Sequence, residues 1–152
     1  MHQFVLAIAT GLYTGYIRLV PGTFGTIPAW LIGYFLIRGN QPVLAAATAL
    51  TFLVSVWAAT RAEHELGHDS RKIVIDEWAG MFVAFLLVPY SLTGYVLAFV
   101  AFRFFDVVKI WPAGKLEKLP KGWGVTMDDV AAGVQANLAT QLVLFVIHKI
   151  GV

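Results

Sequence analysis

The sequence predicts an all-α membrane protein: a compact polytopic helical bundle with short or re-entrant helices, in a single domain of residues 1–152. Composition is the first reason, because 59% of the residues are hydrophobic, 13% are charged and the mean hydropathy is +0.74. Soluble domains have a charged fraction near one quarter. The second reason is a set of charge-free runs close to the roughly 20 residues that a spanning helix needs. The third is that all nine acidic residues lie between Glu63 and Asp129.

The charge-free runs predict three helices. In the run 19–37, prolines and glycines near the start predict a helix that begins near Phe24 and ends before Arg38. Residues 42–60 form a second run, and residues 130–147 form the last one. Residues 1–20 either span the membrane or lie in its interface, and the sequence leaves both possibilities open.

The charge-free stretch 78–102 predicts a helical hairpin. As one span it would place Asp76-Glu77 and Asp106 on opposite faces of the membrane. A turn at 89–94, where proline and glycine occur, keeps these charges on one face. Each arm then has about 11 apolar residues, roughly 17 Å of helix. We therefore expect two short arms and not one span.

The basic residues predict the orientation. Loops 61–75 and 110–127 carry six of the 11 lysines and arginines, and the turn at 89–94 carries none. By the positive-inside rule these loops, and the active site with them, face the cytoplasm. An anionic phospholipid bilayer is the expected partner, and nucleic acid is not, because no basic run has interleaved aromatic residues. The absence of cysteine excludes thiolate metal sites. The oligomeric state is left open.

Two adjacent acid pairs, Asp76-Glu77 and Asp128-Asp129, each come just before an apolar run. Each pair is followed one turn later by a glycine that leaves room for another helix or a ligand: Gly80 and Gly133. One explanation is helix capping, by Thr126 or Asp128 in the second pair, or a favourable interaction with the helix dipole. Two such pairs on the same side favour a divalent-metal site, since Mg²⁺ prefers carboxylate oxygens.

Three charged residues follow at helical spacing: Arg103, Asp106 and Lys109. On one helix they lie on the same side, so they form either an internal ladder of ion pairs or a phosphate site. In the second interpretation Arg103 and Lys109 bind phosphate oxygens, and Asp106 binds the metal or orients the two cations.

Two further segments are weaker candidates. The Pro-Gly loop at 21–25 can present free N–H groups to an anion, with Gly22 and Thr23 near phosphate, although a threonine cap after Pro-Gly is the commoner explanation. Glu63 falls in a polar loop, where charged side chains are ordinarily solvated. Its neighbours are only weak candidates for a zinc site: His64, Glu65, His68 and Asp69.

Five motifs occur in order between Pro21 and Gly133: Pro21-Gly22-Thr23 with Gly25; Ala62-Glu63, Leu66-Gly67 and Asp69; Ile73 to Glu77 with Gly80; Phe102 to Asp106 with Lys109 and Pro112; and Gly124, Met127-Asp128-Asp129 and Ala132-Gly133. Together they resemble the phosphatidylglycerophosphatase A family of integral membrane enzymes of bacterial phospholipid synthesis. Ile110 departs from the pattern, because the family often has proline there.

The resemblance implies Mg²⁺-dependent hydrolysis of phosphatidylglycerophosphate to phosphatidylglycerol and phosphate in the bacterial inner membrane. We then expect Asp76 and Asp129 to be the principal metal ligands, and further ligands or a base among three other acids: Glu77, Asp128 and Glu63. Arg103 and Lys109 would hold the phosphomonoester and Gly22-Thr23 would cap it. The nucleophile is expected to be water, with Thr23 as the alternative.

The competing function is a small ion-coupled transporter that uses the carboxylates at the helix ends. It predicts acids near the middle of helices on two inverted repeats, and no internal repeat is visible in the sequence. A purely structural membrane subunit is the third class.

Overall fold

The computed structural model describes residues 2–17, 20–67 and 70–151. Its elements are α1 (His2–Ala9), the 3-10 turn η1 (Thr14–Tyr16), α2 (Pro21–Leu31), the π-helix η2 (Ile32–Ile37), α3 (Gln41–Leu66), α4 (Ile75–Phe85), α5 (Leu92–Val108), α6 (Ala113–Leu116) and α7 (Gly122–Ile150). Every regular element in these ranges is helical, which confirms the predicted all-α class.

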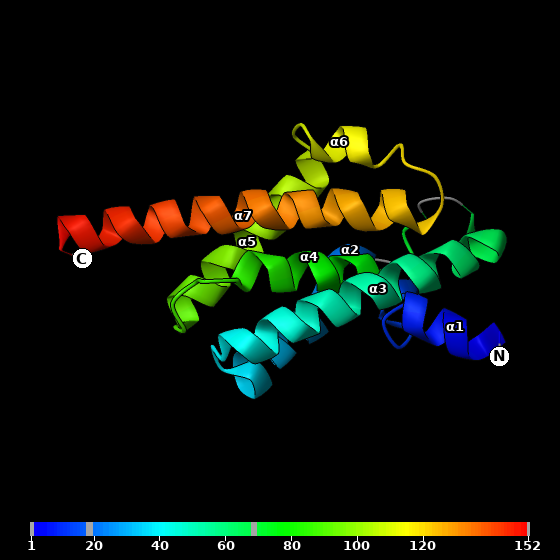
Figure 1. Ribbon diagram of the computed structural model, residues 1–152, viewed down its shortest axis with the longest axis horizontal. Coiled ribbons are helices and arrows are strands. Elements are labelled where there is room, and N and C mark those ends of the chain that lie inside the picture. Colours follow the sequence, from blue (N-terminus) through cyan, green and yellow to red (C-terminus); the bar gives the residue numbers. More distant parts are fainter. Residues whose placement is uncertain (1, 18–19, 68–69, 152) are drawn as a thin grey trace.

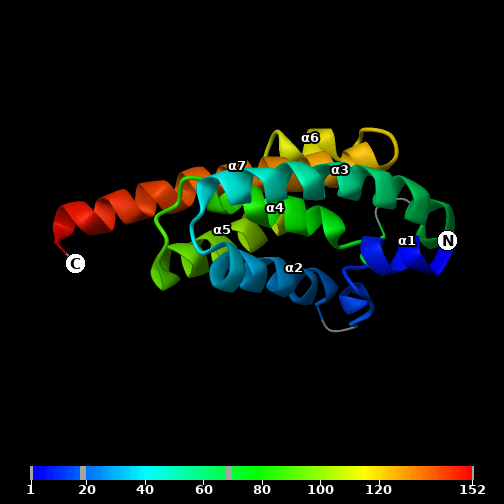
Figure 2. The same ribbon diagram turned by 60° about the horizontal axis from the view of Figure 1, so that its bottom comes forward.

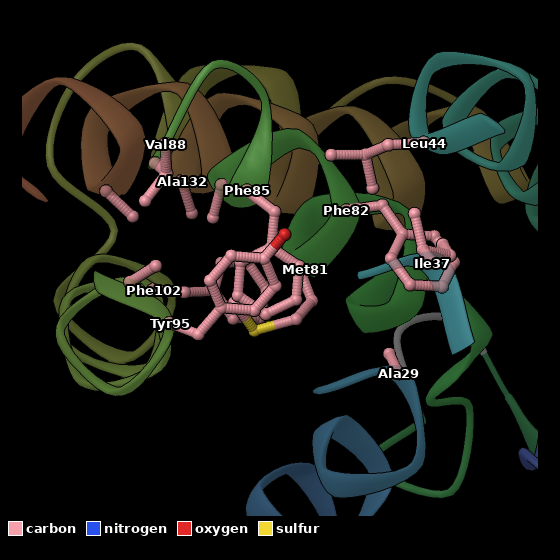
Figure 3. Close-up of a cluster of buried hydrophobic side chains, with 13 residues drawn as sticks. Ala29, Ile37, Leu44, Met81, Phe82, Phe85, Val88, Tyr95, Phe102 and Ala132 are labelled. Atoms are coloured by element: carbon pink, nitrogen blue, oxygen red, sulfur yellow. The ribbon is translucent and has the colours of Figure 1, made fainter. Parts of the chain in front are cut away.

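The short helix α4 is the centre of the bundle, and α2, α3, α5 and α7 pack around it (Figures 1 and 2). Nine of its 11 residues are buried. Figure 3 shows how its side chains meet those of α5, with Phe85 stacked on Tyr95 at 4.1 Å between ring centroids and Phe102 close by. The acid pair Asp76-Glu77 is therefore in the first turn of the most enclosed helix of the fold.

The predicted hairpin is confirmed, since α4 ends at Phe85 and α5 begins at Leu92. Its turn is at 86–91 and not at 89–94, because residues 92–94 form the first turn of α5 after Ser91 in the capping position. Its reversal is closed by side chains that satisfy free backbone groups. The amide of Asn137 donates to the carbonyl oxygens of Ala84 and Leu86, at 3.1 and 2.5 Å. The hydroxyl of Ser91 accepts from the N–H of Gly94 at 3.0 Å. A helix end in an apolar environment needs such partners, because water is not there to supply them.

Helices α3 and α7 are long and apolar enough to cross a membrane, judged by length and composition. Many of their large apolar side chains are exposed, among them Leu50, Leu53, Leu138, Leu142 and Phe145. The C-terminal end of α7 extends beyond the other helices (Figure 1). An apolar exterior of this kind suits a lipid environment.

The predicted helix limits need correction. Helix α2 begins at Pro21 and not near Phe24, because proline is well tolerated at the first position of a helix. Helix α3 continues to Leu66, and α7 begins eight residues before position 130. Helix α5 has 17 residues and not about 11, since it runs through the charged segment to Val108. Charge-free runs mark the apolar part of a helix, and polar turns continue it at either end.

Candidate functional site

A cavity of about 530 Å³ opens at the end of the bundle where α4 and α7 begin and α5 ends. Its polar lining consists of Ser70, Arg71, Asp76, Glu77, Arg103, Asp106, Lys109, Glu117, Asp128 and Asp129, and its other described lining residues are Val20, Pro21, Gly22, Ile73 and Val107. All five carboxylates of the predicted metal site and both predicted phosphate-binding cations therefore reach one space.

The close packing of α4 against α7 brings the two acid pairs together. A Cβ atom on Gly80 would lie 2.6 Å from the carbonyl oxygen of Asp129. A Cβ atom on Gly133 would collide with the carbonyl oxygen of Gly80. The expectation that these glycines permit close approach of another helix is met. Because Asp76 and Asp129 lie one turn before them, the backbone crossing fixes the separation of the acids.

The second acid pair does not start a helix. Helix α7 begins at Gly122 after Lys121 in the capping position, so Asp128 and Asp129 are its seventh and eighth residues. The capping explanation by Thr126 or Asp128 is therefore wrong. The hydroxyl of Thr126 instead lies 2.7 Å from that of Ser55 on α3. The first pair does lie in the first turn of its helix, as expected.

Glu77 and Arg103 meet across the interior of the site. Glu77 Oε2 lies 2.5 Å from the hydroxyl of Thr26 and 3.3 Å from Arg103 Nη1. Arg103 Nη1 is also 2.7 Å from Asp106 Oδ2. A Cβ atom on Gly22 would lie 2.5 Å from Arg103 Nη2, so the glycine leaves space for the guanidinium. Arginine is thus held by two carboxylates beside the first turn of α2.

Lys109 occupies a separate position at the end of α5. Its backbone is left-handed, with φ of 49°, which ends the helix and turns the chain toward α6. Its Nζ atom is 2.8 Å from Asp128 Oδ2 and 2.7 Å from Glu117 Oε1. Glu117 is a site residue that the sequence reasoning missed. The sequence indicates Glu117 only by its position, because it is the one acidic residue in a basic segment that contains several lysines.

Asp76 and Asp129 are the two carboxylates of the site without a basic partner among the described residues. Their exposed fractions are 5% and 4%. Asp76 Oδ1 accepts a hydrogen bond from the N–H of Glu77 at 3.0 Å. Burying an unpaired carboxylate is costly. With these two acids included, the described lining of the cavity has six carboxylates and three basic side chains. Positive charge at this point would relieve the repulsion between the acids.

The donor set suits a hard divalent cation, because every candidate ligand is a carboxylate oxygen. In the described part of the chain, no group of three or more histidine, cysteine or acidic side chains is placed so that it could hold a metal ion together. Mg²⁺ commonly takes one or two carboxylates and completes its coordination with water and phosphate oxygens. Asp76 and Asp129 can provide such an incomplete protein set.

Comparison with known proteins identifies the chain. A sequence model of phosphatidylglycerophosphatase A matches residues 7–144, most of its length. The chain belongs to the phosphatidylglycerophosphatase A family. It is 34% identical over 133 residues to "Phosphatidylglycerophosphatase A" of Haemophilus influenzae, covering 85% of this chain and 82% of the relative. It is 32% identical over 133 residues to the Escherichia coli protein of the same name, covering 84% and 76%.

A third relative has another printed name. The chain is 35% identical over 148 residues to a protein of Bacteroides thetaiotaomicron named "Putative phosphatidylinositol-3-phosphatase", covering 92% of this chain and 93% of the relative. No solved structure matches. All three names describe phosphatases of phospholipids. Membership of the phosphatidylglycerophosphatase A family therefore makes this chain a phosphatase of lipid metabolism and sets the transporter interpretation aside.

Two predicted site residues of this family member lie elsewhere. Thr23 lines a separate cavity of about 250 Å³, whose other lining residues are apolar: Ile27, Trp30, Val96 and Phe99. Residues 21–25 are the first turn of α2 and not a loop. The residue of α2 that reaches the acids is Thr26, which the sequence reasoning missed. The small residues Gly22, Gly25, Thr26 and Ala29 recur at helical spacing and could have indicated the inward face of α2.

Glu63 also lies away from the cavity lining. It is in the last turns of α3 together with His64 and Glu65, so the predicted polar loop is helical there. Helix α3 continues past its apolar run, which the composition did not indicate. His68 and Asp69 lie outside the described residues.

Proposed function

We propose that this phosphatase hydrolyses phosphatidylglycerophosphate to phosphatidylglycerol and inorganic phosphate, with Mg²⁺ as its cofactor. The observation that carries the proposal is the pair of buried carboxylates Asp76 and Asp129, which have no basic partner among the described residues and share a cavity with Arg103 and Lys109. The family to which the chain belongs supports the lipid phosphomonoester as substrate.

Asp76 and Asp129 would hold the metal ion, and the carboxylates of Glu77, Asp106 and Asp128 line the same cavity. When bound, Mg²⁺ would neutralise charge on the phosphoryl group and favour ionisation of an attacking water. The protein's own part is then to align the phosphomonoester, since phosphoryl transfer depends mainly on positioning and charge stabilisation.

Arg103 and Lys109 would bind the phosphate oxygens, but both are held by carboxylates in the present structure. A cation held there would compete with the two basic side chains for those carboxylates. Arg103 would then be free to contact phosphate, while Thr26 keeps Glu77 in place. Metal binding and phosphate binding would in this way support each other.

In the proposed reaction a water oxygen attacks phosphorus and the bond from phosphorus to the headgroup glycerol oxygen breaks. A site carboxylate takes a proton from the water, and the departing glycerol oxygen is protonated to a hydroxyl. Water is preferred to Thr23 as nucleophile because Thr23 lines the other cavity. Trapping a phosphorylated enzyme with labelled substrate would contradict this choice.

The deciding experiment measures phosphate release from the purified protein with phosphatidylglycerophosphate, phosphatidylinositol 3-phosphate, phosphatidate and a soluble phosphomonoester. Mg²⁺ is titrated after treatment with a chelator. We expect the highest kcat/KM with phosphatidylglycerophosphate and activity that returns with Mg²⁺. A preference for the inositol lipid would overturn the headgroup assignment. Full activity after metal removal would overturn the assignment of Mg²⁺ as the cofactor.

A further inference from the structure

The segment that precedes α4 places a third basic side chain on the cavity that contains the acids. Arg71 lines this cavity together with Ser70 and Ile73 of the same segment. Arg71 is exposed, whereas Asp76 and Asp129 of the same lining are buried. Arg71 therefore lies toward the mouth of the cavity and the two acids lie at its base. The reaction proposed above uses the base and gives Arg71 no part.

Arg71 differs from the other two basic residues of the cavity in its partners. Arg103 and Lys109 are each held by two carboxylates. Arg71 makes no ion pair and no side-chain hydrogen bond with any residue that the structure describes. A guanidinium presents its N–H donors in a planar fork that matches the oxygens of a phosphate. The donors of Arg71 are thus available to an anionic group that enters the cavity.

The backbone around Arg71 is fixed by the N-terminal part of the chain, which runs beside it (Figure 2). The N–H of Val74 donates to the carbonyl oxygen of Ala9 at 2.9 Å. A Cβ atom on Gly15 would collide with the carbonyl oxygen of Lys72, so η1 meets this segment backbone to backbone. Because the rim is already ordered, less conformational entropy is lost when Arg71 binds a ligand.

The neighbouring Lys72 is directed elsewhere. Its Nζ atom lies 5.0 Å from the centre of the Tyr16 ring, and Lys72 is not among the described lining residues of the cavity. Both Arg71 and Lys72 are exposed cations on one segment, so an anionic membrane surface would attract them to a similar degree. Only Arg71 also reaches the cavity. The pair therefore separates binding in the cavity from general attraction to a surface.

Phosphatidylglycerophosphate has a second anionic group that the proposed reaction leaves without a partner. Its terminal phosphomonoester would lie at the base of the cavity, near Arg103 and Lys109. Its phosphodiester is one glycerol unit away, on the side of the lipid tails, and so comes nearer the mouth. A cavity of about 530 Å³ has room for more than a phosphoryl group. The phosphodiester would thus be on the side of the cavity where Arg71 lies.

We propose that Arg71 is a specificity-determining residue that donates hydrogen bonds to the phosphodiester of the substrate at the mouth of the cavity. This inference rests on the proposed function, because it needs a phospholipid that carries a phosphodiester beside the phosphomonoester that is cleaved. It explains how the site distinguishes such a lipid from phosphatidate, which has a phosphomonoester and no phosphodiester.

The test compares two substrates that differ by one charge. Phosphatidylglycerophosphate is compared with a synthetic analogue whose phosphodiester is methylated to a neutral phosphotriester. KM and kcat are measured with Mg²⁺ at a fixed mole fraction of lipid in neutral detergent micelles. For wild type we expect a KM about tenfold higher for the neutral analogue, the scale of a hydrogen bond to a charged group.

The variants assign this difference to a residue. Arg71→Gln should raise KM for the charged lipid until the ratio of the two KM values is close to one. Arg71→Lys keeps the positive charge and should retain most of the ratio. Lys72→Gln removes the same charge from the same segment and should keep the wild-type ratio. Because KM does not depend on the fraction of active protein, partial unfolding of a variant leaves the comparison valid.

Equal KM values of wild type for the two lipids would overturn the inference, and so would a wild-type ratio in Arg71→Gln. A similar loss of the ratio in Lys72→Gln would also overturn it, because the effect would then come from surface charge and not from the cavity. Each of these results leaves the proposed function intact. If wild type cleaves neither lipid, the proposed function itself fails.

Discussion

Thr26 links three charged or polar partners in the interior of the site. Its hydroxyl lies 2.5 Å from Glu77 Oε2 and 2.8 Å from the carbonyl oxygen of Gly22, so its single proton goes to one of these two. It also accepts from Arg103 Nη1 at 3.3 Å. Because Thr26 is fully buried, it sets the position of Glu77 and, through it, of the arginine that we expect to bind phosphate.

Thr26→Val is therefore expected to lower kcat/KM about tenfold to a hundredfold, the scale of hydrogen bonds to charged groups. Thr26→Ser keeps the hydroxyl and should stay close to wild type. Steady-state kinetics of both variants, with thermal unfolding in detergent as the control for folding, decide the matter. A fully active Thr26→Val protein would show that Glu77 needs no support from α2.

Asp129→Asn separates function from stability. Loss of a principal metal ligand should reduce kcat/KM at least about a hundredfold. The same substitution removes a buried carboxylate that has no basic partner in the described part of the chain, so the midpoint of thermal unfolding should stay the same or rise. Differential scanning fluorimetry and phosphate release measure the two effects. An active but destabilised Asp129→Asn protein would contradict the metal-ligand assignment.

Among single residues, the charged side chains of the site could be predicted from the sequence. The residues that contact them could not. Acid pairs at the edges of apolar runs point to a site by their chemistry and position in the sequence. Thr26 could not be distinguished from Thr23 by composition. Which face of α2 turns toward α4 depends on which of its small residues pack against that helix. The place of Glu117 in the site depends on how α6 brings it back to Lys109.

The elements that decide the site are α4 and α7, which meet backbone to backbone at Gly80 and Gly133. Small residues at such a crossing let two helices approach more closely than side chains would allow. The hairpin could be predicted because proline and glycine mark its turn and because the charges require it. The limits of the helices could not be predicted, since the polar turns at the end of α3 and at both ends of α7 carry no apolar signal.

Gly133→Ala should force the two helices apart, because its Cβ would meet the backbone of Gly80 and backbone cannot move aside cheaply. We expect a loss of about 1–3 kcal/mol in stability, typical of overpacking, together with reduced activity. Val134→Ala, at the exposed neighbouring position, is the matched control. Unfolding midpoints and kinetics that match wild type would show that the crossing tolerates a methyl group.

In the whole molecule, polarity is divided between the two ends of the bundle. The cavity lies where α3 ends and α7 begins, with the exposed cations Arg61, Arg71, Lys72, Lys115, Lys118 and Lys121 on the segments of that end. The other end has the turn between η2 and α3, with Arg38. From this division, which was visible in the sequence, we propose that the chain crosses the membrane more than once with its site toward the cytoplasm.

The absence of native cysteine gives a direct test of that orientation. Single variants Lys118→Cys and Arg38→Cys place one thiol at each end, both at exposed positions. A membrane-impermeant maleimide should label Lys118→Cys from the cytoplasmic side and Arg38→Cys from the opposite side. Labelling of both from one side would show that α3 does not cross the membrane.

The shortness of α4 has a consequence for where the enzyme can work. Eleven residues of helix extend about 16 Å, roughly half of the hydrocarbon thickness of a bilayer. With the acids at the membrane surface, the turn after Phe85 would lie near the bilayer midplane, where the side chain of Asn137 takes the place of water. The catalytic helix then belongs to one leaflet. Lipid in the opposite leaflet would have to flip across before this phosphatase could reach it.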